Sequence, residues 1–180
     1  MREVAGYFAQ VEAAIDAAHA AHAEMLEAVP AGLRASLPVD ATGVTQGIEI
    51  LAAAVGVEAE IRAARDRLNR ANPAVLHGRV FGRGAPLAPE TVVAAFADGA
   101  RVRATLLERL ASEIDGAELR DEVRGLLAEH PPPGGDGEGE GDPDASPAGH
   151  AARVAALRAA YDAQERAVLL CAGRLDATRG

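Results

Sequence analysis

The chain has 180 residues, of which 49% are hydrophobic and 3% aromatic, and its formal net charge is −9. This acidic balance excludes a general nucleic-acid binder, which needs a basic surface, and a protein attracted to anionic membranes. No apolar run reaches the roughly 20 residues of a membrane span, and acids interrupt the N-terminal segment where a signal peptide would be apolar. We therefore expect a cytoplasmic protein. The single cysteine excludes an internal disulfide and argues against a cysteine-based zinc site.

Alanine and leucine dominate the sequence while β-branched and aromatic residues are few, which predicts an all-α chain. The first helix is expected over residues 3–29, where apolar positions alternate by four and three as in a heptad seam. His22 lies on this seam, either as a hydrogen-bonded core residue or as a ligand. His19 lies one position to the side, near Glu12 and Asp16.

The second predicted helix covers residues 42–72 and ends at Asn72, because Pro73 disfavours helical conformation in the residue before it. At 100° per residue its solvent side holds Glu58, Arg62, Arg65 and Asn69. The opposite side then holds Glu49 and Glu60. Either these two carboxylates point toward the axis of a bundle, or they form a second hydrated strip on a helix between two neighbours.

Residues 73–88 are predicted to be a connection that carries three glycines together with Arg79 and Arg83. Glycine-rich backbone beside arginines, just before a helix N-terminus, is a candidate anion-binding loop. The spacing fits neither a phosphate-binding P-loop nor a dinucleotide fingerprint. The alternative is a plain connection that packs Val80 and Phe81 onto the core.

The third predicted helix begins at Pro89, and Arg103 lies in the middle of its apolar face. A buried arginine needs a partner, because an unpaired buried charge is very costly. Asp115-Gly116 is expected to interrupt this helix. A shorter helix then restarts with a capping-box pattern and runs to about His130.

Residues 131–149 are rich in glycine, proline and acids, with no basic residue, and are expected to be a disordered acidic linker. The last helix is predicted over residues 150–177. Gln164 interrupts its apolar seam, and Cys171 lies on the seam as a buried, unreactive thiol.

These elements predict an up-down-up-down four-helix bundle with one extra short helix. Residues 1–130 supply the first three helices and the short helix, the linker follows, and residues 150–180 supply the last helix of the same domain. At a rise of about 1.5 Å per residue, Glu60, Arg103 and Gln164 reach similar heights and are expected to share a buried polar layer. His22 is expected near Glu49.

The function most consistent with these patterns is non-catalytic association through helices, as a homodimer or with a protein partner, and without a cofactor. One alternative is a ferritin-like metal-dependent enzyme that uses His22, Glu49 and Glu60, although the chain has no Glu-x-x-His motif. Another is a small-ligand pocket between helices, around these residues and Tyr161. Arg124 and His130 have the R-x5-H spacing of HEPN-type ribonucleases, but the polar residue expected after the arginine is a glycine.

Overall fold

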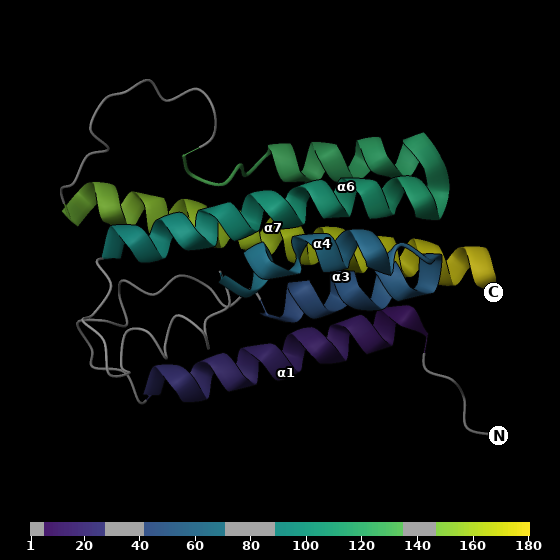
Figure 1. Ribbon diagram of the computed structural model, residues 1–180, viewed down its shortest axis with the longest axis horizontal. Coiled ribbons are helices and arrows are strands. Elements are labelled where there is room, and N and C mark those ends of the chain that lie inside the picture. The colour runs from purple at the N-terminus through teal and green to yellow at the C-terminus, as the bar shows by residue number, and fades with distance from the viewer. Residues whose placement is uncertain (1–5, 28–41, 71–88, 135–146) are drawn as a thin grey trace.

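The computed structural model describes residues 6–27, 42–70, 89–134 and 147–180. All regular structure in these ranges is helical, which confirms the predicted all-α class. The helices lie side by side along the long axis of the molecule (Figure 1) and have these bounds: α1 Tyr7–Glu27, α3 Thr42–Val55, α4 Glu58–Arg70, α6 Pro89–Ala128 and α7 Pro147–Arg179. Within the described ranges, no helix has the length and apolar character needed to cross a membrane.

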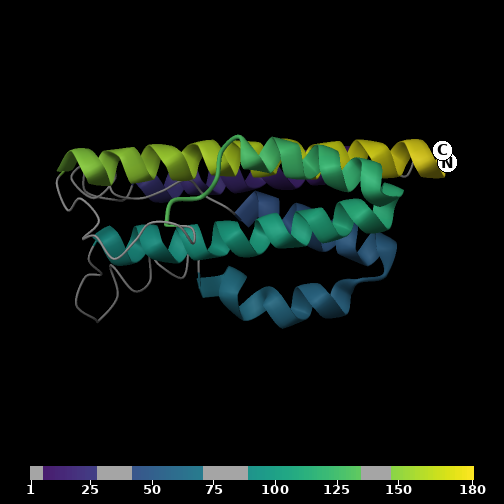
Figure 2. The same cartoon turned by 90° about the horizontal axis from the view of Figure 1, so that it is seen from above.

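The prediction of one continuous helix over residues 42–72 is wrong. The chain turns at Gly56 and forms two helices, α3 and α4. Gly56 has a φ of +80°, a left-handed conformation that favours glycine. The Val57 N–H donates to the Ala52 carbonyl at 3.0 Å, the bond that closes a Schellman motif at a helix C-terminus. Glu58 and Glu60 then occupy the first turn of α4, where acids are favourable. Figure 2 shows α4 folded back beside α3 and α6.

The break predicted at Asp115-Gly116 is confirmed. Both residues leave the helical conformation, and Gly116 has a φ of +69°. The chain reverses there, so α6 consists of a first limb (89–114) and a second limb (117–128) that run side by side (Figure 2). Arg174 of α7 donates to the carboxylates of Asp115 and Glu122 and thereby joins both sides of the reversal to α7.

Helix α7 packs against α6, α1 and α3. Its buried face alternates small and larger side chains, which lets neighbouring helices approach closely: Ala160, Tyr161, Ala163, Gln164, Ala167, Val168, Cys171 and Ala172. The helix begins at Pro147, earlier than the predicted residue 150, since proline suits the first helical position. Residues 135–146 of the predicted linker lie outside the described residues.

The end of α7 holds the start of α1. Asp176 accepts hydrogen bonds from the backbone N–H groups of Tyr7 at 2.8 Å and of Phe8 at 3.0 Å. These are two of the N–H groups that a helix N-terminus leaves without an internal partner. Arg179 donates to the Tyr7 hydroxyl at 2.9 Å and to the Ala54 carbonyl, so α1, α3 and α7 are fastened at one end.

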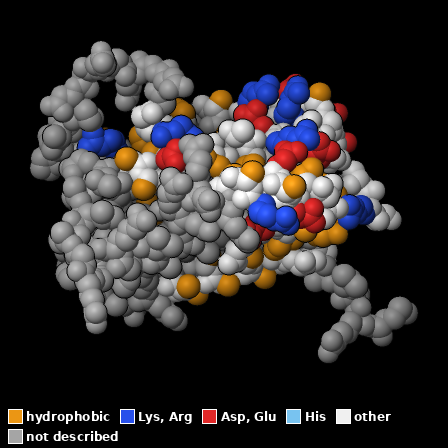
Figure 3. Space-filling model, in the orientation of Figure 1, with side chains coloured by type: hydrophobic (Ala, Val, Ile, Leu, Met, Phe, Trp, Pro, Cys, Tyr) orange, Lys and Arg blue, Asp and Glu red, His pale blue; other side chains and the backbone are white. Residues whose placement is uncertain are grey.

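The face shown in Figure 3 carries interleaved basic and acidic side chains rather than a field of one sign. Arg109 pairs with Glu60 and Glu113, and Arg124 pairs with Glu108 and Asp121. All of these groups are at least partly exposed, so solvent screens the charges and each pair contributes little to stability.

Gly56→Ala is expected to lower the free energy of unfolding by about 1–2 kcal/mol, because a Cβ disfavours the left-handed conformation. Gly125→Ala is the matched control, since an added Cβ at this exposed helical position meets nothing within 4 Å. The control is expected to stabilise the protein by up to about 1 kcal/mol. Urea unfolding followed by circular dichroism measures both. Equal effects of the two substitutions would contradict the turn at Gly56.

Candidate functional site

Arg103 and Gln164 form a buried polar contact between α6 and α7, as the sequence predicted. Their side chains are 2% and 1% exposed. The Arg103 Nε donates to the Gln164 Oε1 at 2.9 Å, and the Gln164 Nε2 donates to the Ala100 carbonyl at 2.7 Å. Gln164 thus uses both its acceptor and its donor, and it links a buried guanidinium to the backbone of α6.

Glu60 does not join this layer, which corrects the prediction. Its side chain is 47% exposed and pairs with Arg109, whose Nε lies 3.1 Å from a Glu60 carboxylate oxygen. The carboxylate raises the pKa of the Arg109 guanidinium, and Glu113 adds to this effect. The physical reason is the turn at Gly56. It ends the helical phase that the prediction carried from Glu49 to Glu60.

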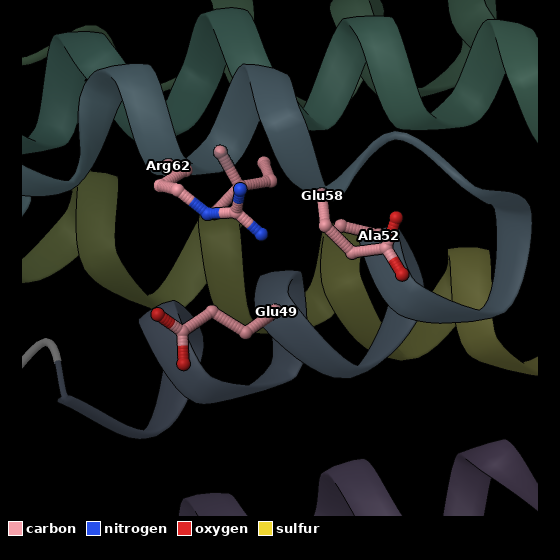
Figure 4. Close-up of a pocket in the computed structure, with 5 residues that line it drawn as sticks. Glu49, Ala52, Glu58 and Arg62 are labelled. Atoms are coloured by element: carbon pink, nitrogen blue, oxygen red, sulfur yellow. The ribbon is translucent and has the colours of Figure 1, made fainter.

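Glu49 is half-buried and lines an open pocket between α3 and α4, so it does not reach the bundle axis. The pocket has a volume of about 180 Å³, and its lining consists of Glu49, Ala52, Glu58, Ile61 and Arg62. In Figure 4 the Arg62 guanidinium points toward the middle of the pocket, and the carboxylates of Glu49 and Glu58 lie on either side of it. Tyr161 does not line this pocket, and the predicted ligand pocket around His22, Glu49 and Tyr161 stays a prediction, because the His22 side chain lies outside the described residues.

Tyr161 instead contacts His19, which also lies beside Glu165, and the sequence patterns did not predict this cluster. His19 Nε2 lies 3.1 Å from the Tyr161 hydroxyl and 3.3 Å from a Glu165 carboxylate oxygen. Tyr161 is buried, whereas the His19 side chain is 46% exposed. One feature of the sequence pointed to this cluster: Tyr161 and Glu165 are four residues apart and therefore share one face of a helix.

Among residues 6–27, 42–70, 89–134 and 147–180, no group of three or more His, Cys, Asp or Glu side chains could hold a metal ion. The ferritin-like alternative therefore gains no support there. The side chain of His22, and Arg79 and Arg83 of the candidate anion loop, lie outside the described residues. Arg124 of the R-x5-H pair is engaged with Glu108 at 2.9 Å.

A groove on the surface between α1 and α7 is almost entirely apolar. Its lining consists of Phe8, Leu169, Leu170, Gly173 and Ala177, with Arg166 and Arg174 at the edges. Phe8 is 39% exposed and is the large hydrophobic side chain that the described part of the chain leaves most open. Phe8 belongs to the predicted seam of the first helix, whose members Val11, Ile15 and Ala18 are buried. The burial of Val11, Ile15 and Ala18 on this seam was thus predicted correctly, but the exposure of Phe8 was not.

Gln164→Leu is expected to lower the free energy of unfolding by about 2–3 kcal/mol, because it leaves the buried Arg103 Nε without its acceptor. Arg124→Gln is the control for an exposed arginine and is expected to cost about 1 kcal/mol or less. Chemical denaturation of both variants checks this. A cost for Gln164→Leu no larger than that of the control would show that the buried contact does not stabilise the fold.

Cys171 is fully buried, and burial raises the pKa of its thiol to about 12, with Glu122 adding to the rise. A free thiol titrates at about 8.5, so above that pH the unfolded chain loses this proton while the folded chain retains it. The contribution of this thiol to stability is therefore complete below about pH 8.5 and declines as the pH rises toward 12.

We expect the folded protein at pH 8 to react slowly with a thiol reagent and the urea-unfolded protein to react rapidly. Between pH 8 and pH 10, stability should fall more steeply in the wild type than in Cys171→Ala, which lacks the titrating group. Fast labelling of the folded protein, or parallel pH slopes, would contradict the burial of this thiol.

No protein-family model matches the chain, and comparisons with curated proteins and with solved structures find no significant similarity. Function is therefore inferred from the geometry of the described residues. The surface features that bear on it are the apolar groove between α1 and α7 and the charged pocket between α3 and α4.

Proposed function

We propose that the protein is a non-catalytic helical protein that functions as a homodimer, with the groove between α1 and α7 as its interface. The observation that carries this proposal is the apolar lining of the groove, with Phe8 exposed beside it. Contiguous apolar surface of this kind marks interaction sites, since water solvates it poorly.

The groove is lined by side chains from both helices, Phe8 from α1 and Leu169, Leu170, Gly173 and Ala177 from α7. A Cβ at Gly173 would lie 3.7 Å from the Phe8 ring, so Phe8 packs beside Gly173 within one copy and leaves part of its ring exposed. In a two-fold dimer, the exposed part of Phe8 in each copy can pack against the apolar lining of its partner's groove.

Charges next to the groove favour a second copy of this chain as the occupant. Glu12 follows Phe8 by four residues and shares its face of α1, while Arg166 borders the groove on α7. Neither side chain has an ion-pair partner within the described part of the chain. A two-fold interface is self-complementary, so Glu12 of one copy can meet Arg166 of the other twice.

We further propose that α1, α3, the first limb of α6 and α7 form an up-and-down four-helix bundle. Contacts of α1 with α3, α3 with α6, α6 with α7, and α7 with α1 support this arrangement, because they close a ring of four neighbours. In it, α4 and the second limb of α6 are additions outside the ring, and the groove lies on the α1–α7 side.

Phe8→Asp is expected to convert the dimer to a monomer, since it places a charge in the apolar centre of the interface. Ala152→Asp is the matched control, because it adds the same charge at an exposed position near the other end of α7. Light scattering coupled to size-exclusion chromatography should give twice 18.4 kDa for the wild type and the control, and 18.4 kDa for Phe8→Asp.

Thermal unfolding of all three proteins verifies that Phe8→Asp remains folded. A wild-type protein that stays monomeric over an about hundredfold range of concentration would overturn the proposal. A Phe8→Asp variant that remains dimeric would show that another face forms the interface.

A further inference from the structure

Beyond dimerisation, we propose that the pocket between α3 and α4 binds a small zwitterion, specifically a free aliphatic amino acid. The turn at Gly56 creates this pocket, because it folds α4 back along α3 instead of continuing the helix. Ala52 and Ile61 are 0% and 4% exposed and supply an apolar floor, while Glu49, Glu58 and Arg62 supply charges around the opening.

The arrangement of Glu58 and Arg62 is the central observation. A glutamate four residues before an arginine on a helix is well placed for an ion pair. These two side chains do not form one, and neither is paired with any other residue that the structure describes. Figure 4 shows the Arg62 guanidinium pointing toward the middle of the pocket and the Glu58 carboxylate on one side of it.

Glu49 differs from these two side chains, because it already takes part in another interaction. The two charged groups of the lining that have no partner among the described residues are therefore one guanidinium and one carboxylate. A ligand that satisfies both must itself carry one negative and one positive group. A metal ion would satisfy only the carboxylates, and a phosphate only the guanidinium.

An aliphatic amino acid matches each part of the lining. A guanidinium binds a carboxylate through two parallel hydrogen bonds, so Arg62 would bind the α-carboxylate. The ammonium group would lie against Glu58, and the alkyl side chain would cover Ala52 and Ile61. The volume of about 180 Å³ leaves room for a molecule the size of an amino acid.

The test compares three ligands of similar shape by following amide chemical shifts of residues 49–62 in ¹⁵N-labelled protein. L-Leucine carries both charges, isopentylamine only the positive one, and 4-methylpentanoate only the negative one. We expect saturable shifts with leucine and binding about threefold to tenfold weaker for the other two, because each lacks one exposed ion pair. Equal affinity for all three ligands, or no saturable shift with leucine, would overturn the proposal.

Variants of the lining locate the site. Glu58→Gln and Arg62→Gln are each expected to weaken leucine binding about threefold to fivefold, since each removes one charge and keeps a similar size. Arg120→Gln is the matched control, because this arginine lies on α6 and pairs with Asp121. Leucine binding that is unchanged in both lining variants, or weakened equally in the control, would place the site elsewhere and contradict the proposal. Phe8→Asp should leave leucine binding unchanged, so the two proposals fail independently.

Discussion

The buried contact between Arg103 and Gln164 constrains the way in which α6 and α7 pack. A guanidinium that is 2% exposed has lost its water, and its Nε finds its acceptor in one amide oxygen of the facing helix. If α7 shifted by four residues, about one turn, along α6, Ala160 or Val168 would face Arg103, and neither has a side-chain acceptor. A buried polar pair of this kind fixes the register of two helices even where it adds little net stability. Helices α1 and α3 then pack on the surface that α7 presents.

The turn at Gly56 sets the positions of the charged side chains that follow it. It shortens the helix that carries the strongest apolar pattern and folds the remainder outward as α4. As a result Glu60 pairs with Arg109 at the surface, whereas a continuous helix would have directed it inward. The same turn also produces the pocket whose lining comes from both sides of the break.

The two proposed sites lie on different pairs of helices and have different chemistry. The groove between α1 and α7 is apolar, and the contacts of Asp176 and Arg179 hold the start of α1 in place beside it. Phe8 is therefore presented from a fixed helix end, which lowers the entropy lost when a second copy binds. The pocket between α3 and α4 is charged and open, so its ligand is held mainly by ion pairs and a small apolar floor.

Much of the fold was predictable from the sequence, because helix-forming residues and heptad spacing act locally. The seam of the first helix, the break at Asp115-Gly116, the burial of Cys171 and the internal position of Arg103 all follow from such patterns. The partnership of Arg103 with Gln164 was also predictable, since a rise of about 1.5 Å per residue places them at similar heights.

The position of Glu60, the pocket at Glu49 and the contact of His19 with Tyr161 became clear only from the tertiary structure. The sequence did contain a signal for the first two: a glycine followed closely by acids is typical of a helix that ends and restarts. Apolar residues at helical spacing continue on both sides of Gly56, however, and this pattern favoured one unbroken helix. Once Gly56 adopts its left-handed conformation, the helical phase before the turn no longer sets the directions of the side chains after it. The composition and periodicity of the chain therefore determined that it is helical and which faces are apolar. The partners of its charged side chains depended on where the helices turn and which neighbour each one meets.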